Sequence, residues 1–255
     1  TTTPVEARPV QAVPIDLDAS GSGAAGGRIT EFVLAGGARI RPDDPDYDPP
    51  NRAQEVVSAR SEHSRLTANP DGTFTADVSP GRLNYQARDG TWQPLDLSLG
   101  ADEQGYRVKG HDRDIVFSAT LDGSTLVTMG TDKAMVAIRA LGYDGAAEKS
   151  GEALVDRAAA GHDAVSFQAS DYGVEFRAIL DDASASRTYR FALDPGGLAV
   201  AIADDGRSIR LTRTQSSPTQ GEIIEELGSI SAPILFDADG VVAPDDAVTV
   251  AIAPL

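Results

Sequence analysis

The chain has no cysteine, and this absence excludes a disulfide framework, a thiolate metal site and a cysteine nucleophile together. Aromatic residues make up only 5% of the sequence, with a single tryptophan, Trp92. The core is therefore expected to consist mainly of Val, Ile, Leu and Ala. No apolar run reaches the roughly 18 residues that a membrane-spanning helix needs, so membrane insertion is not expected.

Positive charge is also scarce. The sequence holds 22 Lys and Arg against 39 Asp and Glu, and its formal net charge is -17 at pH 7. Such a surface repels phosphate backbones and anionic lipid headgroups, so nucleic-acid binding is not expected. A chain of 255 residues can bury one large core or two smaller ones. A core of that size needs no cross-links, so the lack of cysteine is compatible with a secreted bacterial protein.

Proline and glycine separate an N-terminal arm from a long β-rich region. Residues 1–52 read as a Pro/Gly-rich arm or linker with one candidate strand at 29–34. We expect residues 1–27 to be mobile unless a partner or the main domain holds them, because they cannot bury enough apolar surface. The turn-rich stretch 142–151 then divides the remainder into a first β-rich half, 53–145, and a second, 146–255.

Two Asp-Gly turns, Asp71-Gly72 and Asp89-Gly90, each lead into a strand that carries an aromatic residue. Both residue types tolerate the left-handed backbone of tight hairpins, so the pair predicts an antiparallel meander. Short strands are expected at 74–78, 82–86, 92–97, 106–109, 115–120, 125–128, 135–141, 164–168, 172–180, 186–193, 198–203, 208–212, 222–227 and 248–252. This spacing favours an all-β fold, an antiparallel β-sandwich or two packed β-rich halves. Residues 152–160 fit either two helical turns or a strand.

Catalytic signatures are weak. His63, His111 and His162 do not have the spacing of a metal site, and the sequence holds no Gly-x-Ser-x-Gly elbow. Paired carboxylates are abundant, at 181–182, 204–205, 225–226, 237/239 and 245–246. A β-sandwich hydrolase would need two of them to converge in a cleft, one with a raised pKa. Most lie in turns, where carboxylates accept backbone hydrogen bonds, so we expect no catalytic residues and no enzyme activity.

One acidic motif is a candidate for calcium. Asp237-Ala238-Asp239-Gly240 begins like a calcium-binding loop but lacks the Glu that closes one, so Asp237 and Asp239 are its candidate ligands. The tract Asp43-Asp44-Pro45-Asp46-Tyr47-Asp48 is more typical of a solvated acidic linker. No other cofactor is expected.

Trp92, Tyr85 and Tyr106 are candidate ligand-binding residues, because aromatic side chains can form a platform for sugar rings. The alternative is core packing. Trp92 and Tyr85 flank the Asp89-Gly90 turn, and opposing one another across the hairpin would stabilise it without a ligand. Exposure of Trp92 together with Tyr85 or Tyr106 distinguishes a carbohydrate-binding module from a structural one.

The order of several segments resembles a known family. These are Val-Val-Ser-Ala-Arg-Ser-Glu-His-Ser-Arg at 56–65, Asn-Pro-Asp-Gly-Thr-Phe-Thr at 69–75, Leu-Asn-Tyr at 83–85 and Gly-Thr-Trp-Gln-Pro-Leu-Asp at 90–96. The resemblance continues more loosely at 165–167, 172–176 and 231–240, with Glu175 where an Asp is usual in the family. The set resembles the N-terminal β-rich region of secreted or wall-associated bacterial proteins that carry YD (Rhs-type) repeats or DNRLRE modules.

That resemblance implies a secreted, cell wall-associated Gram-positive protein in which this region precedes a repeat shell or a wall-associated body, sometimes with a polymorphic toxin domain. The present sequence contains neither a YD-repeat array nor a toxin motif. The resulting expectation is a non-catalytic structural and interaction module. Its partners are the downstream repeat or wall-associated domains of the same protein, and cell-wall polysaccharide if the carbohydrate-binding alternative holds.

Overall fold

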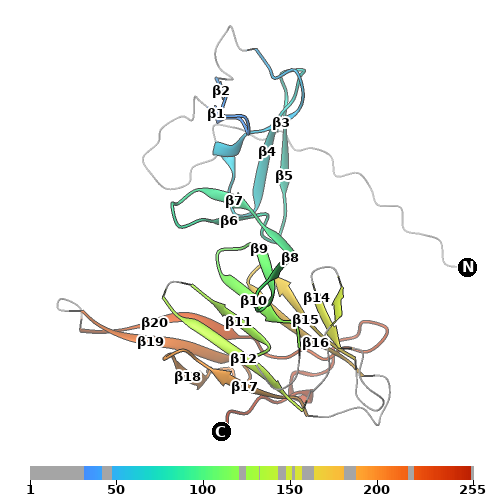
Figure 1. Cartoon of the computed structure of the whole chain (residues 1–255), viewed down its shortest axis with the longest axis vertical. Helices are drawn as coiled ribbons and strands as arrows, with labels where there is room; N and C mark the ends of the chain where they lie inside the picture. Colours follow the sequence, from blue (N-terminus) through green and yellow to red (C-terminus); the bar gives the residue numbers. More distant parts are fainter. Residues whose placement is uncertain are drawn as a thin grey trace, which may run out of the picture. The chain divides into compact units, whose positions relative to one another are not determined.

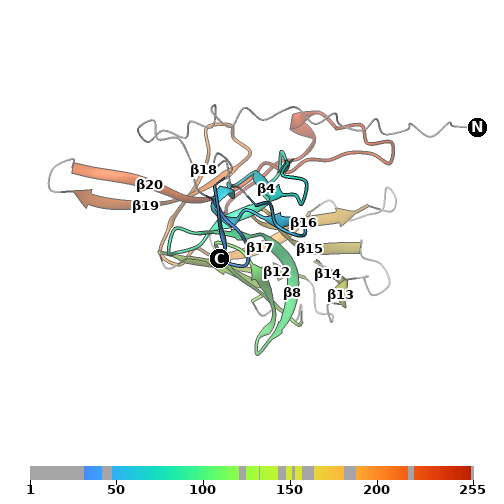
Figure 2. The same ribbon diagram turned by 90° about the horizontal axis from the view of Figure 1, so that it is seen from above.

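The computed structural model describes residues 32–41, 48–120, 125–131, 133–142, 148–150, 153–156, 164–180, 188–217 and 221–253. In these ranges the regular structure consists of antiparallel β-strands and two short 3-10 turns, η1 (Val57–Ala59) and η2 (Asp245–Ala247). The predicted all-β fold is confirmed (Figures 1 and 2). Residues 1–27, expected to be mobile, lie outside the described residues.

The chain forms two compact units, Thr1–Pro94 and Leu95–Leu255. The boundary between the units, at residues 94 and 95, does not coincide with the divisions expected near residues 52 and 145. Strands β12 (Met135–Leu141) and β17 (Arg190–Asp194) pair with each other across the turn-rich stretch near 145. Residues from the expected arm, Phe32 and Ile40, are buried in the core of the first unit.

The first unit contains a three-stranded sheet and two strand pairs. The sheet has the order β3 (Gln54–Glu55), β4 (Ser64–Ala68), β5 (Phe74–Val78), and the pairs are β1 (Phe32–Val33) with β2 (Arg39–Ile40) and β6 (Asn84–Gln86) with β7 (Trp92–Pro94). Along β4 the buried Leu66 and Ala68 alternate with more exposed residues, as a strand with one covered face requires. These side chains share a core with Phe32, and the rings of Phe32 and Phe74 lie 6.0 Å apart.

Both predicted Asp-Gly turns are present. Gly72 has φ +84°, a backbone conformation that is strained for residues with a side chain. Asp71 Oδ1 accepts hydrogen bonds from the N–H and the hydroxyl of Thr73, at 3.0 and 2.6 Å. The second turn, Asp89-Gly90-Thr91, repeats the arrangement at 2.9 and 2.7 Å. The two hairpins are thus fixed by interactions within the turns themselves.

Three antiparallel sheets make up the second unit. The largest has the order β17-β12-β11-β10-β9-β8, the next β13-β14-β15-β16 and the smallest β18-β19-β20. The remaining strands are β8 (Asp96–Asp102), β9 (Gly105–Gly110), β10 (Asp114–Ser118), β11 (Val127–Gly130), β13 (Glu148–Ser150), β14 (Ala153–Asp156), β15 (Ala164–Ser170), β16 (Gly173–Ile179), β18 (Ala199–Ile202), β19 (Ile209–Ser217) and β20 (Gly221–Ile230). The strand alternative for residues 152–160 is confirmed at β14.

The six-stranded and four-stranded sheets enclose one core, which gives the unit its sandwich-like character. Ile115 and Phe117 from β10 and Leu154 from β14 are fully buried, and Phe167 from β15 is buried beside them. Phe191 of β17 packs edge-on against Phe167, with ring centroids 6.4 Å apart. Such edge-to-face pairs add to the free energy of area burial, so the few aromatic residues are concentrated where the sheets meet.

The three-stranded sheet joins the large sheet through a separate small core of Val136, Leu198 and Leu211. The strand expected at 248–252 is wrong. Those residues follow η2 in an irregular segment with no strand partner among the described residues. Their β-branched composition favours a strand, but a strand forms only where a neighbour completes its hydrogen bonds. Within the described ranges, the structure contains no helix of the length and apolarity that a membrane crossing requires.

Candidate functional site

The candidate sugar platform is divided between two faces of a hairpin. In the β6–β7 register, Tyr85 pairs with Gln93 and Gln86 pairs with Trp92. Directly paired residues share a face and adjacent residues alternate, so Tyr85 and Trp92 project from opposite faces. The expected opposition of these two rings across the hairpin is therefore wrong. Both side chains are half-buried.

Tyr106 belongs to the second unit, on β9. Its ring packs against the core between the two larger sheets, and Lys149 Nζ lies 5.7 Å from the ring centroid. Lys149 Nζ also donates a 2.6 Å hydrogen bond to the carbonyl oxygen of Leu99, which fixes the ammonium group beside the ring. These contacts support the core-packing interpretation of Tyr106.

A buried asparagine anchors the hairpin that carries Trp92. Asn84 is completely buried, and its Nδ2 donates to the carbonyl oxygens of Ser61 and Ser64, at 2.6 and 3.1 Å. Its Oδ1 accepts from Nε of Arg65 at 3.0 Å. Because a buried amide needs all its partners, this network ties the start of β6 to the start of β4.

A second arginine connects the same hairpin to β3. Arg60 forms a two-point ion pair with Glu55, at 2.7 and 2.9 Å, and donates from Nη1 to the carbonyl oxygen of Trp92 at 3.0 Å. The hydrogen bond from Arg60 lowers the pKa of Glu55 below its usual range. These interactions assign Arg60 and Glu55 a structural role, since each holds backbone in place.

The candidate calcium ligands occupy a hairpin turn. Asp237 Oδ1 accepts hydrogen bonds from the N–H groups of Asp239 and Val241, at 3.0 and 2.9 Å. Both acidic residues are exposed. Across the part of the chain that the structure describes, no group of three or more His, Cys, Asp or Glu side chains is arranged to hold a metal ion. In the acidic tract at 43–48, only residue 48 lies within the described ranges.

The histidines of the described ranges stabilise turns. His63 Nδ1 lies 3.1 Å from the carbonyl oxygen of Gly81. The side chain of His111 is fully buried: its Nδ1 accepts from the N–H of Arg113 at 2.9 Å, and its Nε2 lies 3.2 Å from the carbonyl oxygen of Ser170. His111 thus links the β9–β10 turn to the β15–β16 turn. His162 and the pair at 181–182 lie outside the described residues.

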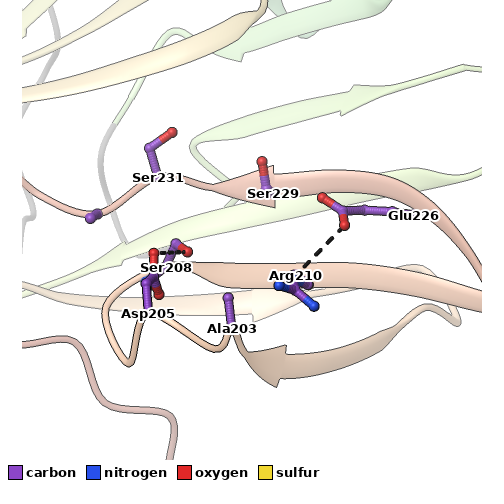
Figure 3. A pocket seen from close by; sticks show the side chains of 8 residues that line it. Ala203, Asp205, Ser208, Arg210, Glu226, Ser229 and Ser231 are labelled. Carbon is purple, nitrogen blue, oxygen red and sulfur yellow. Dashed lines mark hydrogen bonds and ion pairs between the residues drawn. The ribbon is translucent and has the colours of Figure 1, made fainter.

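Asp205, one member of the carboxylate pair at 204–205, lines a hollow of about 350 Å³ on the three-stranded sheet (Figure 3). Asp205, Ser208, Arg210 and Glu226 are among the residues that line it. Hydrogen bonds to Asp205 from the Ser208 hydroxyl and then from the backbone of Ser208 and Arg207 lower its pKa to about 2. The general acid of a glycosidase needs a raised pKa, whereas the pKa of Asp205 is lowered, so Asp205 does not meet this requirement.

The two carboxylates at 225–226 differ in their basic partners. Glu225 accepts from Lys133 Nζ at 2.9 Å and from Arg213 Nη2 at 3.0 Å, and these bonds, the one from Lys133 first, lower its pKa. The interaction fastens β20 and β19 to the turn between β11 and β12. Glu226 lies 4.0 Å from Arg210 on the opposite face of the sheet.

Several large apolar side chains are exposed in a short hairpin near the C-terminus of the chain. Phe236 pairs with Val242 across the turn, and Ala243 N–H donates to the carbonyl oxygen of Leu235 at 2.8 Å. Phe236 is 64% exposed and Val242 61% exposed. Ile234, 69% exposed, precedes Phe236 by two residues, the spacing that returns a side chain to the same face of an extended chain.

We call Ile234, Phe236 and Val242 the apolar face. The sequence pattern indicated a turn at 237–240 but did not predict the apolar face. The sequence does contain two short apolar runs, Ile-Leu-Phe before the turn and Val-Val after it. These runs equally fit a buried strand, so only the structure distinguishes an exposed face from a core one.

Comparisons with protein families, with curated proteins and with solved structures find no match to this chain.

Proposed function

We propose that the chain is a non-catalytic structural and interaction module of a larger secreted, wall-associated protein. It docks onto an adjoining module of the same polypeptide through the apolar face, Ile234, Phe236 and Val242. The observation that carries this proposal is the exposure of all three side chains, each above 60%, on one side of one hairpin. Single exposed apolar residues are common on protein surfaces, but a contiguous group marks an interaction site.

The energy available from this face is sufficient for docking within one polypeptide. Burying a Val, Ile or Phe side chain completely contributes about 1.5–3 kcal/mol, so covering three side chains that are each roughly two-thirds exposed contributes about 3–6 kcal/mol. A free partner would first have to offset the loss of translational and rotational freedom on association. A tethered module has a high effective concentration, so the same contact is adequate.

The hydrogen bonds and lowered pKa values of several acidic residues support a non-catalytic role. Hydrogen bonds within turns lower the pKa of Asp71, Asp89 and Asp205. Carboxylates in this state remain ionised and are fixed to the backbone, where they stabilise hairpins rather than transfer protons. The resemblance of residues 56–96 to the N-terminal region of YD-repeat and DNRLRE proteins supports the wall-associated setting.

Nile red, a neutral dye whose emission rises in apolar surroundings, tests the apolar face. We expect the wild-type chain to enhance its emission and the double variant Phe236→Ser/Val242→Ser to lose most of the enhancement. Val78→Ser is the matched control, because Val78 is 74% exposed on β5 in the first unit. Equal emission from the wild type and the double variant would show that the face does not form a contiguous apolar surface.

A further inference from the structure

Strand β20 lies at the edge of its sheet. The order β18-β19-β20 leaves one side of this ten-residue strand without a strand partner in the part of the chain that the structure describes. In Figures 1 and 2, β19 and β20 form a long two-stranded ribbon. A free edge presents unpaired N–H and C=O groups, and an extended segment of another protein can complete them by adding a strand.

The outer face of β20 carries a regular pattern of side chains. Glu222, Ile224 and Glu226 face Ser216, Thr214 and Thr212 of β19 in an unbroken register, so the three side chains share one face. Ile224 is 72% exposed. Glu222 is exposed and the side chain of Glu226 is 53% exposed, so an apolar side chain stands between two solvent-facing carboxylates.

The acidic residues on the two faces of β20 differ in their contacts with basic side chains. On the inner face, Glu225 is held by Lys133 and Arg213 at 2.9 and 3.0 Å. On the outer face, Glu226 has only a long contact, 4.0 Å, with Arg210 among the described residues. The inner carboxylate therefore anchors the strand, and the outer carboxylates keep most of their capacity to attract a cation.

A second copy of this chain does not fit the edge. Antiparallel pairing of two β20 strands centred on Ile224 would set Glu222 of each copy directly opposite Glu226 of the other. Like charges directly opposite each other destabilise a strand pair, and a net charge of -17 adds repulsion between copies. The pattern instead complements a strand with basic side chains at positions two residues on either side of an apolar one.

We propose that the edge of β20 binds an extended segment of a partner protein with the pattern basic-x-apolar-x-basic. In the complex, the backbone of this segment extends the sheet, its Lys or Arg side chains lie beside Glu222 and Glu226, and its apolar side chain covers Ile224. This surface is separate from the apolar face, so the proposal does not depend on the proposed function.

Fluorescence anisotropy with synthetic peptides tests the proposal. The probe is a labelled Thr-Lys-Thr-Val-Thr-Lys-Thr peptide, and its twin carries Glu in place of both Lys. We expect the Lys peptide to bind the wild-type chain at least about tenfold more tightly than the Glu peptide, because opposite charges then pair across the strands. The variant Glu222→Lys/Glu226→Lys reverses this order. Phe236→Ser/Val242→Ser leaves it unchanged.

Two controls separate strand addition from general charge attraction. Glu103→Lys/Glu148→Lys changes the net charge by the same amount at exposed positions outside β20, and we expect it to preserve the preference for the Lys peptide. N-methylation of alternate amides on the bonding edge of the Lys peptide is expected to abolish binding. Failure of the Lys peptide to bind, reversal of the order by the control variant, or undiminished binding of the N-methylated peptide would each overturn the proposal.

Discussion

Replacing Asn84 with alanine removes a side chain that is completely buried in the first unit and makes three hydrogen bonds. The carbonyl oxygens of Ser61 and Ser64 lose their amide donor, and Nε of Arg65 loses its acceptor. Because these hydrogen bonds are partly buried in the folded state, their loss destabilises the variant relative to the unfolded chain, where water satisfies all of these groups.

The magnitude follows from the kind of bond lost. Each of the two neutral amide-carbonyl bonds contributes about 1 kcal/mol, and the bond that involves the guanidinium about 1.5–3 kcal/mol. Asn84→Ala is therefore expected to lower the free energy of unfolding of the first unit by roughly 3.5–5 kcal/mol. Small domains have a total stability of about 5–15 kcal/mol, so this loss is a large part of it.

The position of Trp92 makes the assay specific. It is the single tryptophan of the chain and lies in the first unit, so its fluorescence during urea unfolding reports on that unit alone. Far-UV circular dichroism follows the strands of both units. We expect Asn84→Ala to move the fluorescence transition to lower urea while the dichroism keeps a transition at the wild-type position for the second unit.

Asn51→Ala is the matched control, because Asn51 is exposed in the same unit. We expect it to change the fluorescence transition by less than about 0.5 kcal/mol, as surface substitutions usually do. A fluorescence transition of Asn84→Ala that coincides with that of the control would refute the assignment of Asn84 as the anchor of the β6–β7 hairpin.

Two further predictions concern acid stability and sugar binding. Because the folded-state pKa of Asp205 is lowered to about 2, its charge contributes stability above the unfolded pKa of about 3.9, and this contribution is lost as the pH falls toward 2. The difference in urea midpoint between wild type and Asp205→Asn is thus expected to be full at neutral pH and to narrow below about pH 4; a difference that does not vary with pH would contradict this. Trp92 is half-buried, so we expect partial acrylamide quenching and no saturable emission change with wall polysaccharides or calcium, whereas a saturable shift with one glycan would favour the carbohydrate-binding alternative.

Local features of the fold follow from the sequence. The Asp-Gly-Thr turns form because their hydrogen bonds connect residues only two positions apart, and the expected strands at 74–78 and 135–141 match β5 and β12 residue for residue. The apolar residues at 248–252 alternate as they do in a strand, but the strand predicted there does not form, because a strand also needs a partner. Residue patterns do not show whether that partner is present.

Long-range features lie beyond such reasoning. The bond between Arg65 and Asn84 joins residues 19 positions apart, and the pairing of β12 with β17 joins segments about fifty residues apart. No local pattern selects these partners from the alternatives that the same residues permit. Exposure has the same limit: Phe236 and Phe117 both lie in apolar stretches, but one is 64% exposed and the other fully buried.

Photo-cross-linking from position 236, in the larger protein that we propose contains this chain, tests the docking proposal most directly. Phe236→p-benzoylphenylalanine places a photoreactive group on the apolar face, and mass spectrometry identifies the peptides to which it becomes linked. The same substitution at Val78 measures background. We predict links from position 236 to another module of the same polypeptide, well above those from position 78. Equal yields at the two positions, or links to polysaccharide alone, would contradict the proposal.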